Sequence, residues 1–551
     1  MVNRSSRRAE DARTRNGQAM VAKAQQALAV GDIERAAHWA ETALSAGHSD
    51  PMLLNLAAWR REEMEDYAGA HRLLGQALAM VPGDPMILGA VGAVLRKERR
   101  YDEALALLDR VVAAQPAHAA AWLERGYVLD SLQSDRAAAE SYERALSLDP
   151  SLAPALGKLA DGAARRGDAD TARSFAARAL ALNPAEPAAV MAVASLEIEA
   201  RNGQAAEAML RPLLALPLPR DDRTRVLTLL GDALDRQDRT RDAFTAWQQA
   251  QANFRDIYAP ILAPGPERPS HRSFIETIAA QVAATSRPPR SYEGDSPNGA
   301  AATHVFLLGY PRSGTTLVEN VLASAPAVVA LEERDTLTDI DDALLANDGT
   351  MPPLDALDPA LVGRLRNAYW QRVRALAGNV EGRVFVDMNP FNGIKLPIFA
   401  RLFPDARIVV MRRDPRDVAL SCFRINFNPG PGAWAFSDLE ETARHYDALT
   451  SLVELCRERL PLAFHELRYD RLVADFEATV RALAAFVGID WTDAFLRFDK
   501  TARDRGTRTA SVTQVRRGLY DGRGQWRRYE QELAPALPLL APWVRRFGFS
   551  D

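Results

Sequence analysis

A 34-residue repeat constrains the fold of this chain more than any other feature of its sequence. Prolines recur at this spacing at Pro82, Pro116, Pro150 and Pro184, and alanines at Ala36, Ala70, Ala104, Ala138, Ala172 and Ala206. Between these marks the apolar residues follow the period of a helix. A proline suits the point where one helix stops before the next begins, and a small alanine suits the closest approach of two helices. We therefore expect residues 20–255 to form an all-helical solenoid of about seven two-helix units, the last and loosest around Ala243 and Trp247.

The spacing resembles that of the tetratricopeptide repeat, in which two helices form each unit. Chance alanine-rich helices are the alternative, and four prolines in register argue against it. Such arrays usually bind extended peptides or helices on a concave face, so the resemblance implies a protein or peptide partner. We expect residues 1–19 to be disordered. Residues 256–303 are rich in Pro, Gly and Ser and predict a linker with one docking helix near 274–284.

Composition limits the function classes that fit the chain. The 551 residues carry a formal net charge of −4, which gives no sign of a general nucleic-acid binder. Only Cys422 and Cys456 are present, too few for a disulfide framework or a thiolate metal site. The polar start and the lack of any run of about 18 apolar residues predict neither a secretory signal nor a membrane span. We therefore expect a cytoplasmic protein.

The apolar pattern changes at residue 305, and we expect residues 304–551 to form a P-loop-like α/β domain with a parallel sheet. Val305-Phe306-Leu307-Leu308 predicts a buried strand, a glycine-bearing loop follows, and an amphipathic helix comes next. This order aims backbone N–H groups and a helix N-terminus at a phosphate. The loop has the G-x-x-x-x-G frame of nucleotide triphosphatases, but Thr315 replaces their lysine and Arg312 lies inside the loop. A donor with a less charged tail than a triphosphate, such as a phosphosulfate, suits such a loop.

A second phosphate-binding element is predicted about 100 residues further along. Residues 407–411 form another apolar strand pattern, which runs into an arginine-rich turn and a helix that carries Ser421. Arg413 at the strand end and Ser421, eight residues later, can hold one phosphate between them. Taken alone, a solvated arginine rim explains this segment equally well. The loop upstream favours the binding role.

The segment Tyr310–Leu317 resembles the 5'-phosphosulfate loop of sulfotransferases, most closely that of the tyrosylprotein branch. The similarity covers residues 304–548, and the layout of repeats followed by this domain resembles bacterial-type tetratricopeptide sulfotransferases. The resemblance implies that the donor is 3'-phosphoadenosine 5'-phosphosulfate and that no metal is used. It also implies that Arg413 and Ser421 hold the 3'-phosphate. The implied donor-binding residues are Arg312, Ser313, Gly314, Thr315, Thr316, Arg413, Ser421 and Tyr469.

Transfer to a hydroxyl requires a base for the acceptor proton and donor groups for the leaving oxygen. The pair Glu332-Glu333 lies at the same distance from the loop as a Glu-Glu pair of the tyrosylprotein branch. The resemblance implies that Glu333 is the base, that Glu332 tunes it, and that Ser511 stabilises the leaving group. A solvated acidic helix start is the alternative reading of the pair.

One position departs from the family pattern. Met388 stands where the family has the lysine of Asp-Lys-x-Pro, which stabilises charge on the bridging oxygen. Either Lys395 or Arg312 substitutes for that lysine, or activity is low or lost. The main alternative to an enzyme is therefore a tetratricopeptide scaffold whose second domain binds nucleotide without turnover. A P-loop kinase or triphosphatase is disfavoured by the missing loop lysine.

The acceptor is left open by the sequence. Peptide tyrosine follows from the nearest branch and agrees with a peptide-binding solenoid. A saccharide or small-molecule hydroxyl is the alternative acceptor, because the sequence does not show the acceptor groove.

Overall fold

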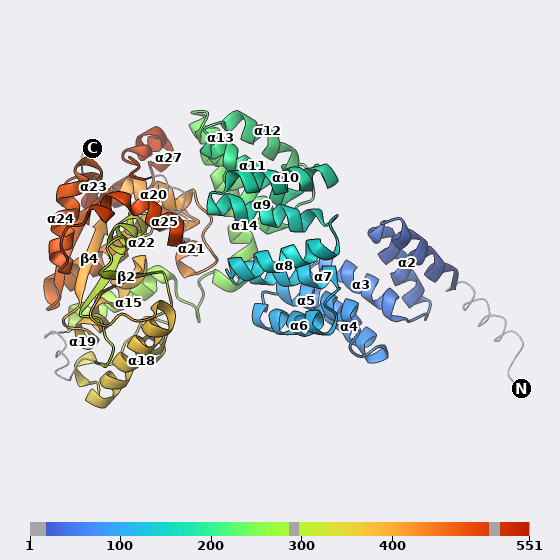
Figure 1. Ribbon diagram of the computed structural model, residues 1–551, viewed down its shortest axis with the longest axis horizontal. Coiled ribbons are helices and arrows are strands. Elements are labelled where there is room, and N and C mark those ends of the chain that lie inside the picture. The colour runs from blue at the N-terminus through green and yellow to red at the C-terminus, as the bar shows by residue number, and fades with distance from the viewer. Residues whose placement is uncertain (1–17, 286–296, 506–517, 550–551) are drawn as a thin grey trace, which may run out of the picture. The chain divides into compact units, whose positions relative to one another are not determined.

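The computed structural model describes residues 18–285, 297–505 and 518–549 (Figure 1). Contacts between residues divide the chain into two compact units, Met1–Val193 and Ala194–Asp551.

The first unit is built from helix pairs that repeat every 34 residues, as the sequence predicts. Residues 18–29 are helical and precede α2 (Ile33–Ser45). The first helices of successive pairs are α3 (Pro51–Glu63), α5 (Pro85–Lys97), α7 (Ala119–Ser131), α9 (Ala153–Arg166) and α11 (Pro187–Glu199), the last of which continues into the second unit. The second helices are α4 (Tyr67–Met80), α6 (Tyr101–Ala114), α8 (Asp135–Leu148) and α10 (Ala169–Leu182).

Local chemistry explains why these helices begin and pack where they do. The side chains of Asp50, Asp66, Asp84 and Asp168 accept hydrogen bonds from the first backbone N–H groups of α3, α4, α5 and α10. The repeated alanines from Ala36 to Ala206 are at most 1% exposed. Helices also approach closely at Gly126, where an added Cβ would lie 2.3 Å from Cε1 of Tyr142. Small residues at the closest approach therefore permit the pairing.

The second unit begins with three helices of the same kind: α12 (Gly203–Leu214), α13 (Arg220–Asp235) and α14 (Thr240–Leu262). Ala243 and Trp247 of α14 are fully buried, and Trp247 lies against Gly231 of α13. These two helices are the last pair expected from the sequence. They pack on the remainder of the unit. We call this remainder, from α15 to the C-terminus, the sheet domain.

The sheet domain contains, within the described residues, one sheet of five parallel strands in the order β2-β3-β1-β4-β5. The strands are β1 (Thr303–Gly309), β2 (Val328–Glu332), β3 (Val384–Met388), β4 (Arg407–Arg412) and β5 (Ala463–Arg468). The longer helices are α15 (His271–Ala284), α16 (Thr315–Ala323), α18 (Pro359–Ala377), α20 (Pro415–Phe423), α22 (Leu439–Arg459), α24 (Phe476–Val487), α25 (Phe498–Arg505) and α28 (Leu537–Arg546). Shorter ones are α17 (Thr338–Leu344), α19 (Leu396–Leu402), α21 (Pro431–Phe436), α23 (Tyr469–Ala474) and α27 (Glu530–Leu533), with 3-10 turns η1 (Leu354–Ala356), η2 (Pro390–Lys395), η3 (Asp493–Arg497) and η4 (Gln525–Tyr529). This confirms the predicted order of a helical repeat region followed by an α/β domain.

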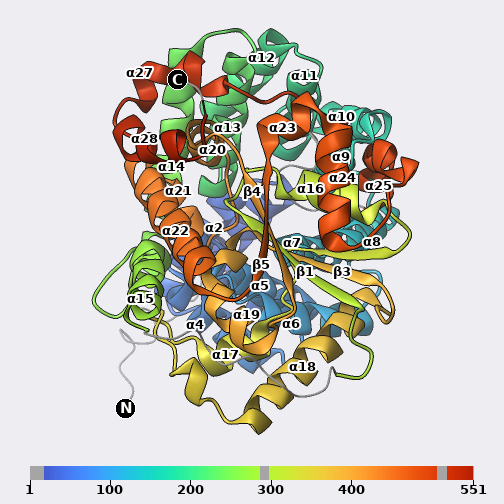
Figure 2. The ribbon, with the colours of Figure 1, turned by 90° about the vertical axis from the view of Figure 1, so that its left-hand side faces the viewer.

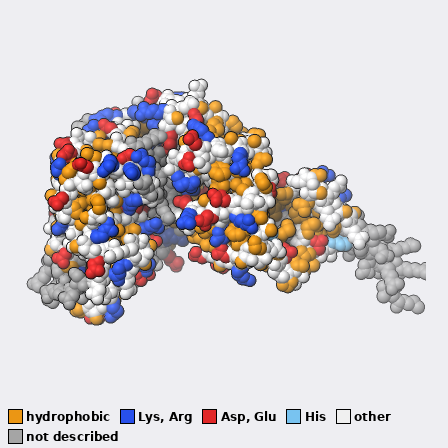
Figure 3. All heavy atoms as spheres, viewed as in Figure 1, with side chains coloured by type: hydrophobic (Ala, Val, Ile, Leu, Met, Phe, Trp, Pro, Cys, Tyr) orange, Lys and Arg blue, Asp and Glu red, His pale blue; other side chains and the backbone are white. Residues whose placement is uncertain are grey.

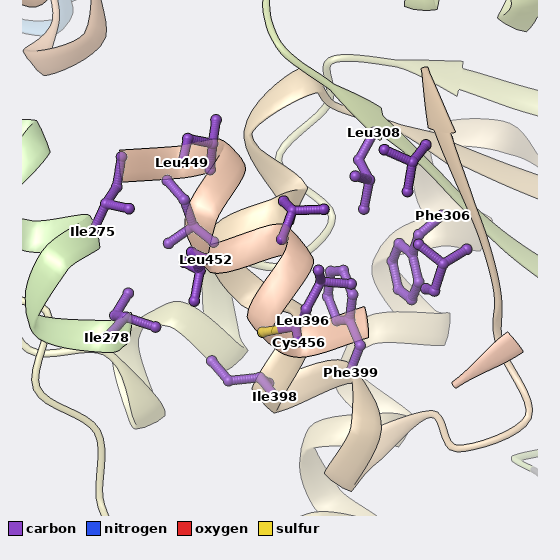
Figure 4. Packing of buried hydrophobic residues seen from close by; sticks show 14 of the residues in the cluster. Ile275, Ile278, Phe306, Leu308, Leu396, Ile398, Phe399, Leu449, Leu452 and Cys456 are labelled. Atoms are coloured by element: carbon purple, nitrogen blue, oxygen red, sulfur yellow. The ribbon is translucent and has the colours of Figure 1, made fainter. Parts of the chain in front are cut away.

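Helices cover both faces of the sheet, with α15, α19 and α22 on one side and α16, α24 and α25 on the other (Figure 2). Successive residues of β1 therefore alternate between two cores: Val305 and Leu307 face one, Phe306 and Leu308 the other. Burial on both faces explains the continuous apolar run of this strand. Figure 4 shows the second core, where Ile275 of α15 and Leu449 of α22 lie in the same cluster as the residues of β1.

The surface mixes charged side chains of both signs with apolar ones on the face shown in Figure 3. Across the described part of the chain, we find no helix with the length and apolarity needed to cross a bilayer.

Candidate active site

The carboxyl ends of the central strands meet at one edge of the sheet. Gly309 of β1 pairs with Met411 of β4, Leu307 of β1 with Met388 of β3, and Met411 with Leu467 of β5. After β1 the chain forms β2 and β3 on one side and then crosses to form β4 on the other. Open parallel sheets bind ligands in the crevice outside such a switch point. The residues predicted from the two phosphate-binding elements lie at this edge.

The loop of residues 310–314 leaves β1 and enters α16. Gly314 precedes the helix with φ of 111°, and an added Cβ would lie 2.9 Å from Cε of Met411 and 3.1 Å from Cδ2 of Tyr469. Only glycine fits there without strain. Thr315 and Thr316 form the first turn of α16 and are each 3% exposed. The N-terminus of this helix thus faces the edge of the sheet where β1 and β4 end.

Arg312 and Ser421 are joined directly, although 109 residues separate them. Nε of Arg312 donates to Oγ of Ser421 at 3.0 Å, and Nη1 of Arg413 donates to the carbonyl oxygen of Arg312 at 3.1 Å. Burial, with a further contribution from the nearby charge of Arg413, lowers the pKa of Arg312 to about 10. Its guanidinium still carries a positive charge at neutral pH. The structure thus places three predicted donor-binding residues in one network.

Tyr469 and Arg413 hold a segment near the C-terminus against the loop. The guanidinium of Arg413 lies over the ring of Tyr469, 4.9 Å from its centre, and donates to the carbonyl oxygen of Gly522 at 2.6 Å. The hydroxyl of Tyr469 donates to the carbonyl oxygen of Tyr520 and accepts from the N–H of Gly522 at 3.3 Å. Asp417 accepts from the N–H groups of Gly524 and Trp526 at 2.8 and 2.9 Å. Sequence reasoning missed Asp417, although it stands in the Arg-Asp-Pro-Arg-Asp run that follows β4 and begins α20.

Three buried donors at this edge have no hydrogen-bond partner among the described residues: Oγ of Ser313 and Nε of both Arg412 and Arg413. Nε of Arg412 lies 3.6 Å from Oε2 of Glu466, an ion-pair partner, which leaves Oγ of Ser313 and Nε of Arg413. Both residues line one pocket, at the ends of β1 and β4, with Gly309 and Met411. Buried polar groups are almost always satisfied, so two unpaired donors beside a helix N-terminus favour an anionic ligand.

Glu333 follows β2 at the same edge. Its N–H donates to the carbonyl oxygen of Met388 at 2.8 Å. The carboxyl group reaches solvent, but the surrounding protein removes enough water to raise its pKa, and the positive charge of Arg312 partly offsets this effect. Glu333 therefore lies close enough to Arg312 to feel its charge. A carboxylate with a raised pKa is suited to accept a proton near neutrality.

Arg312 and Glu333 share an uncommon backbone conformation. Their φ angles are 69° and 47°, and they are the two non-glycine residues of the described sheet domain with positive φ. Such conformations cost of order 1–3 kcal/mol and gather at functional sites. The predicted base and the predicted loop arginine are thus both held in strained positions.

The remaining predicted residues are placed less favourably. Met388 is fully buried in the apolar core beneath α16, and Nζ of Lys395 forms an ion pair with Asp341 at 2.6 Å. Ser511 lies outside the described residues. Arg505, which precedes that segment, donates to the carbonyl oxygen of Ala330 in β2 at 2.7 Å and pairs with Glu319 of α16 at 2.8 Å.

A buried chain of hydrogen bonds behind the loop was not predicted. The hydroxyl of Tyr310 shares a hydrogen bond with Nδ1 of His445 in α22 at 2.8 Å, and Nε2 of His445 shares one with Nδ1 of His271 in α15 at 2.9 Å. Burial lowers the pKa of His271 to about 4 and that of His445 well below its usual value. Both rings are therefore neutral and join the loop to α15. No local pattern marks residues so far apart in sequence.

These neutral histidines predict acid sensitivity. In the unfolded chain His271 takes up a proton near pH 6.5, whereas in the folded protein it does so only near pH 4. The free energy of unfolding therefore has its full value above pH 6.5 and falls as the pH decreases towards 4. We expect His271→Gln, which cannot titrate, to reduce the fall in melting temperature between pH 7 and 5 by about 2–6 °C. Calorimetric melting at several pH values measures this. His38→Gln, at an exposed histidine, should show the same dependence of melting temperature on pH as the wild type. A fall in melting temperature as large in His271→Gln as in the wild type would contradict the prediction.

Comparison with known proteins identifies the domains. Residues 304–493 match the model of the sulfotransferase family, and residues 63–125 and 119–152 match models of the tetratricopeptide repeat. The chain therefore joins tetratricopeptide repeats to a sulfotransferase-family domain. The edge of the sheet described above, from the loop through Arg413 and Tyr469, lies within that domain.

Individual relatives are distant. An uncharacterized protein of Aquifex aeolicus (strain VF5) is 31% identical over 246 residues, which are 43% of this chain. The chain spans about a third of that relative, 32% of its length. Among solved structures, MamA (41-end) from Desulfovibrio magneticus RS-1 is 26% identical and covers 30% of this chain and 95% of its own, with a TM-score of 0.25. A tetratricopeptide repeat protein from Parabacteroides merdae is 16% identical and covers 43% of this chain and 93% of its own, with a TM-score of 0.32.

Proposed function

We propose that this protein transfers a sulfuryl group from 3'-phosphoadenosine 5'-phosphosulfate to an acceptor hydroxyl. The observation that carries the proposal is the pair of buried, unpaired donors, Oγ of Ser313 and Nε of Arg413, at the edge of a sulfotransferase-family domain. Each belongs to one of the two predicted phosphate-binding elements. An anionic ligand satisfies both donors, and a 3'-phosphorylated adenosine phosphosulfate offers one anionic group to each element, at its 5' end and at its 3' end.

The residues present fit such a donor. Backbone N–H groups at the start of α16 and the hydroxyl groups of Ser313, Thr315 and Thr316 suit the 5' end, where Gly314 allows close approach. Arg413 and Ser421 suit the 3'-phosphate, and the ring of Tyr469 lies against Arg413 beside them. The family's general use of this donor supports the same assignment.

In this proposal Glu333 accepts the proton of the acceptor hydroxyl. The acceptor oxygen forms a bond to sulfur while the bond from sulfur to the bridging phosphate oxygen breaks, and that oxygen leaves as part of the 5'-phosphate. Arg312 lies in the loop and its positive charge acts on Glu333, so in this proposal it stabilises the charge on the leaving oxygen. This role replaces that of the family lysine at position 388.

The acceptor that we favour is a peptide tyrosine brought to the domain by the repeats. Support comes from the resemblance of the loop to the tyrosylprotein branch and from the fact that tetratricopeptide arrays usually bind peptides. Two buried free thiols, Cys422 and Cys456, agree with a reducing compartment such as the cytoplasm. The competing proposal is a nucleotide-binding scaffold without turnover, which buried Met388 favours.

Nucleotide binding tests the donor assignment. We expect 3',5'-adenosine bisphosphate to bind at least about 10-fold more tightly than ATP in titration calorimetry without magnesium, because a charged hydrogen bond contributes about 1.5–3 kcal/mol. Equal affinities, or a strict requirement for magnesium, would count against the proposal.

A further inference from the structure

We propose that Asp235 and Asp232 of α13, in the last helix pair of the repeats, are positioning residues for the donor site. The inference rests on the proposed function, since it concerns the 3'-phosphate end of that site. All the contacts on which it depends lie within the second unit of the chain.

The helix that carries Ser421 is fastened to the repeats at its C-terminal end. Nε2 of Gln251 in α14 donates to the carbonyl oxygen of Phe423, the last residue of α20, at 2.6 Å in a buried position. The rings of Phe423 and Phe244 of α14 stack with centres 5.2 Å apart. Ser421 therefore lies two residues from a joint made by the repeat helices.

Arg424, which follows α20, adds ion pairs with α13 to these contacts. Its Nη2 donates to Oδ1 of Asp232 at 2.8 Å and lies 3.6 Å from Oδ2 of Asp235. Its guanidinium lies over the ring of Trp247, 4.7 Å from the centre. The charges of Arg424 and Asp232 also act on Arg312, the residue that donates to Ser421.

Asp235 also holds the C-terminal segment. Its Oδ1 accepts from the hydroxyl of Tyr529 at 2.5 Å and from Nη1 of Arg528 at 2.7 Å, both in η4. Burial by itself would raise the pKa of Asp235, but Arg424, Tyr529 and Arg528 together lower it, so the carboxylate is charged at neutral pH.

The two anchored elements are the ones that surround Arg413. Just before η4, the carbonyl oxygen of Gly522 accepts from Arg413, and its N–H donates to the hydroxyl of Tyr469. Asp417 of α20 accepts from the N–H groups of Gly524 and Trp526. The carboxylate of Asp235 thus contacts both Arg424, at the end of α20, and η4, which follows Gly522 and Gly524 in the chain. The geometry of Ser421 and Arg413 depends on both elements, so the last repeat pair sets the 3'-phosphate site.

The test compares two nucleotides in full-length variants. We expect Asp235→Asn to weaken 3',5'-adenosine bisphosphate by about 3- to 30-fold, the usual range for a residue coupled to a site that it does not touch. Adenosine 5'-phosphate, which lacks the 3'-phosphate, should lose less than about 2-fold, because its contacts lie at the loop and not at Ser421. Asp232→Asn should show the same selectivity with a smaller effect, since its side chain is 27% exposed.

Asp242→Asn on α14 is the matched control, because Asp242 is 54% exposed and pairs with Arg239 of the repeats. It should bind both nucleotides as the wild type does. The inference is overturned if Asp235→Asn and Asp232→Asn keep wild-type affinity for the bisphosphate, or if they weaken both nucleotides equally with a lower melting temperature. Should Asp235→Asn not fold, Asp232→Asn decides by the same criteria. If the wild type binds neither nucleotide, the proposed function itself fails.

Discussion

Replacing Glu333 by glutamine is expected to lower sulfuryl transfer by about 10²- to 10⁴-fold, the usual contribution of a general base. The amide keeps the size of the side chain and the backbone hydrogen bond to Met388 but cannot accept the proton. Affinity for 3',5'-adenosine bisphosphate should stay within about 3-fold, because donor-binding groups are unchanged. Transfer of radiolabelled sulfate to a lysate, followed by identification of the labelled acceptor, supplies the assay.

The pH profile provides a second readout for Glu333. Because desolvation raises the pKa of its carboxyl group, the rate should rise with pH as that carboxyl loses its proton, and this limb should disappear in Glu333→Gln. Glu332→Gln is the neighbouring control and should cost less than Glu333→Gln. Equal losses in both variants would contradict the assignment. No transfer by the wild type, with nucleotide binding intact, would instead support the scaffold.

Replacing Arg413 by alanine is expected to weaken 3',5'-adenosine bisphosphate by about 1.5–3 kcal/mol, which corresponds to about 10- to 150-fold. The guanidinium has a buried Nε without a partner among the described residues, and its other contacts hold Gly522 and the loop carbonyl of Arg312. Adenosine 5'-phosphate should be affected far less. Calorimetric titration of both nucleotides measures the difference.

The control for this substitution is Arg444→Ala on α22, an exposed arginine paired with Glu440. It should leave both affinities unchanged. Loss of both nucleotides to the same degree in Arg413→Ala would show that this arginine supports the fold of the site and does not bind the 3'-phosphate.

The structure shows why restoring the family lysine at position 388 is not a straightforward substitution. Met388 has no exposed surface and lies among the apolar side chains beneath α16. A lysine introduced there must either lose its charge or leave the core, and either outcome costs stability. Restoring the family lysine is therefore a poor test of activity, and Glu333 is the better one.

The sequence by itself determined the repeats and the location of the phosphate-binding elements. Helices start every 34 residues because proline, small residues and capping aspartates act within a few residues of where they stand. The continuous apolar run of β1 likewise marked a strand buried on both faces, and the loop after it followed from its glycine frame. Such features are local, so no knowledge of distant contacts was needed.

Only the tertiary structure decided how the site is assembled. The contact of Arg312 with Ser421, the hydrogen bonds from Tyr310 through His445 to His271, and the salt bridge of Arg528 with Asp235 join residues that lie far apart in the chain. Their positions depend on strand order and on the helices that cover each face, which local patterns do not encode. The burial of Met388 and the left-handed backbone of Arg312 and Glu333 arise in the same way, because packing around them outweighs their intrinsic preferences.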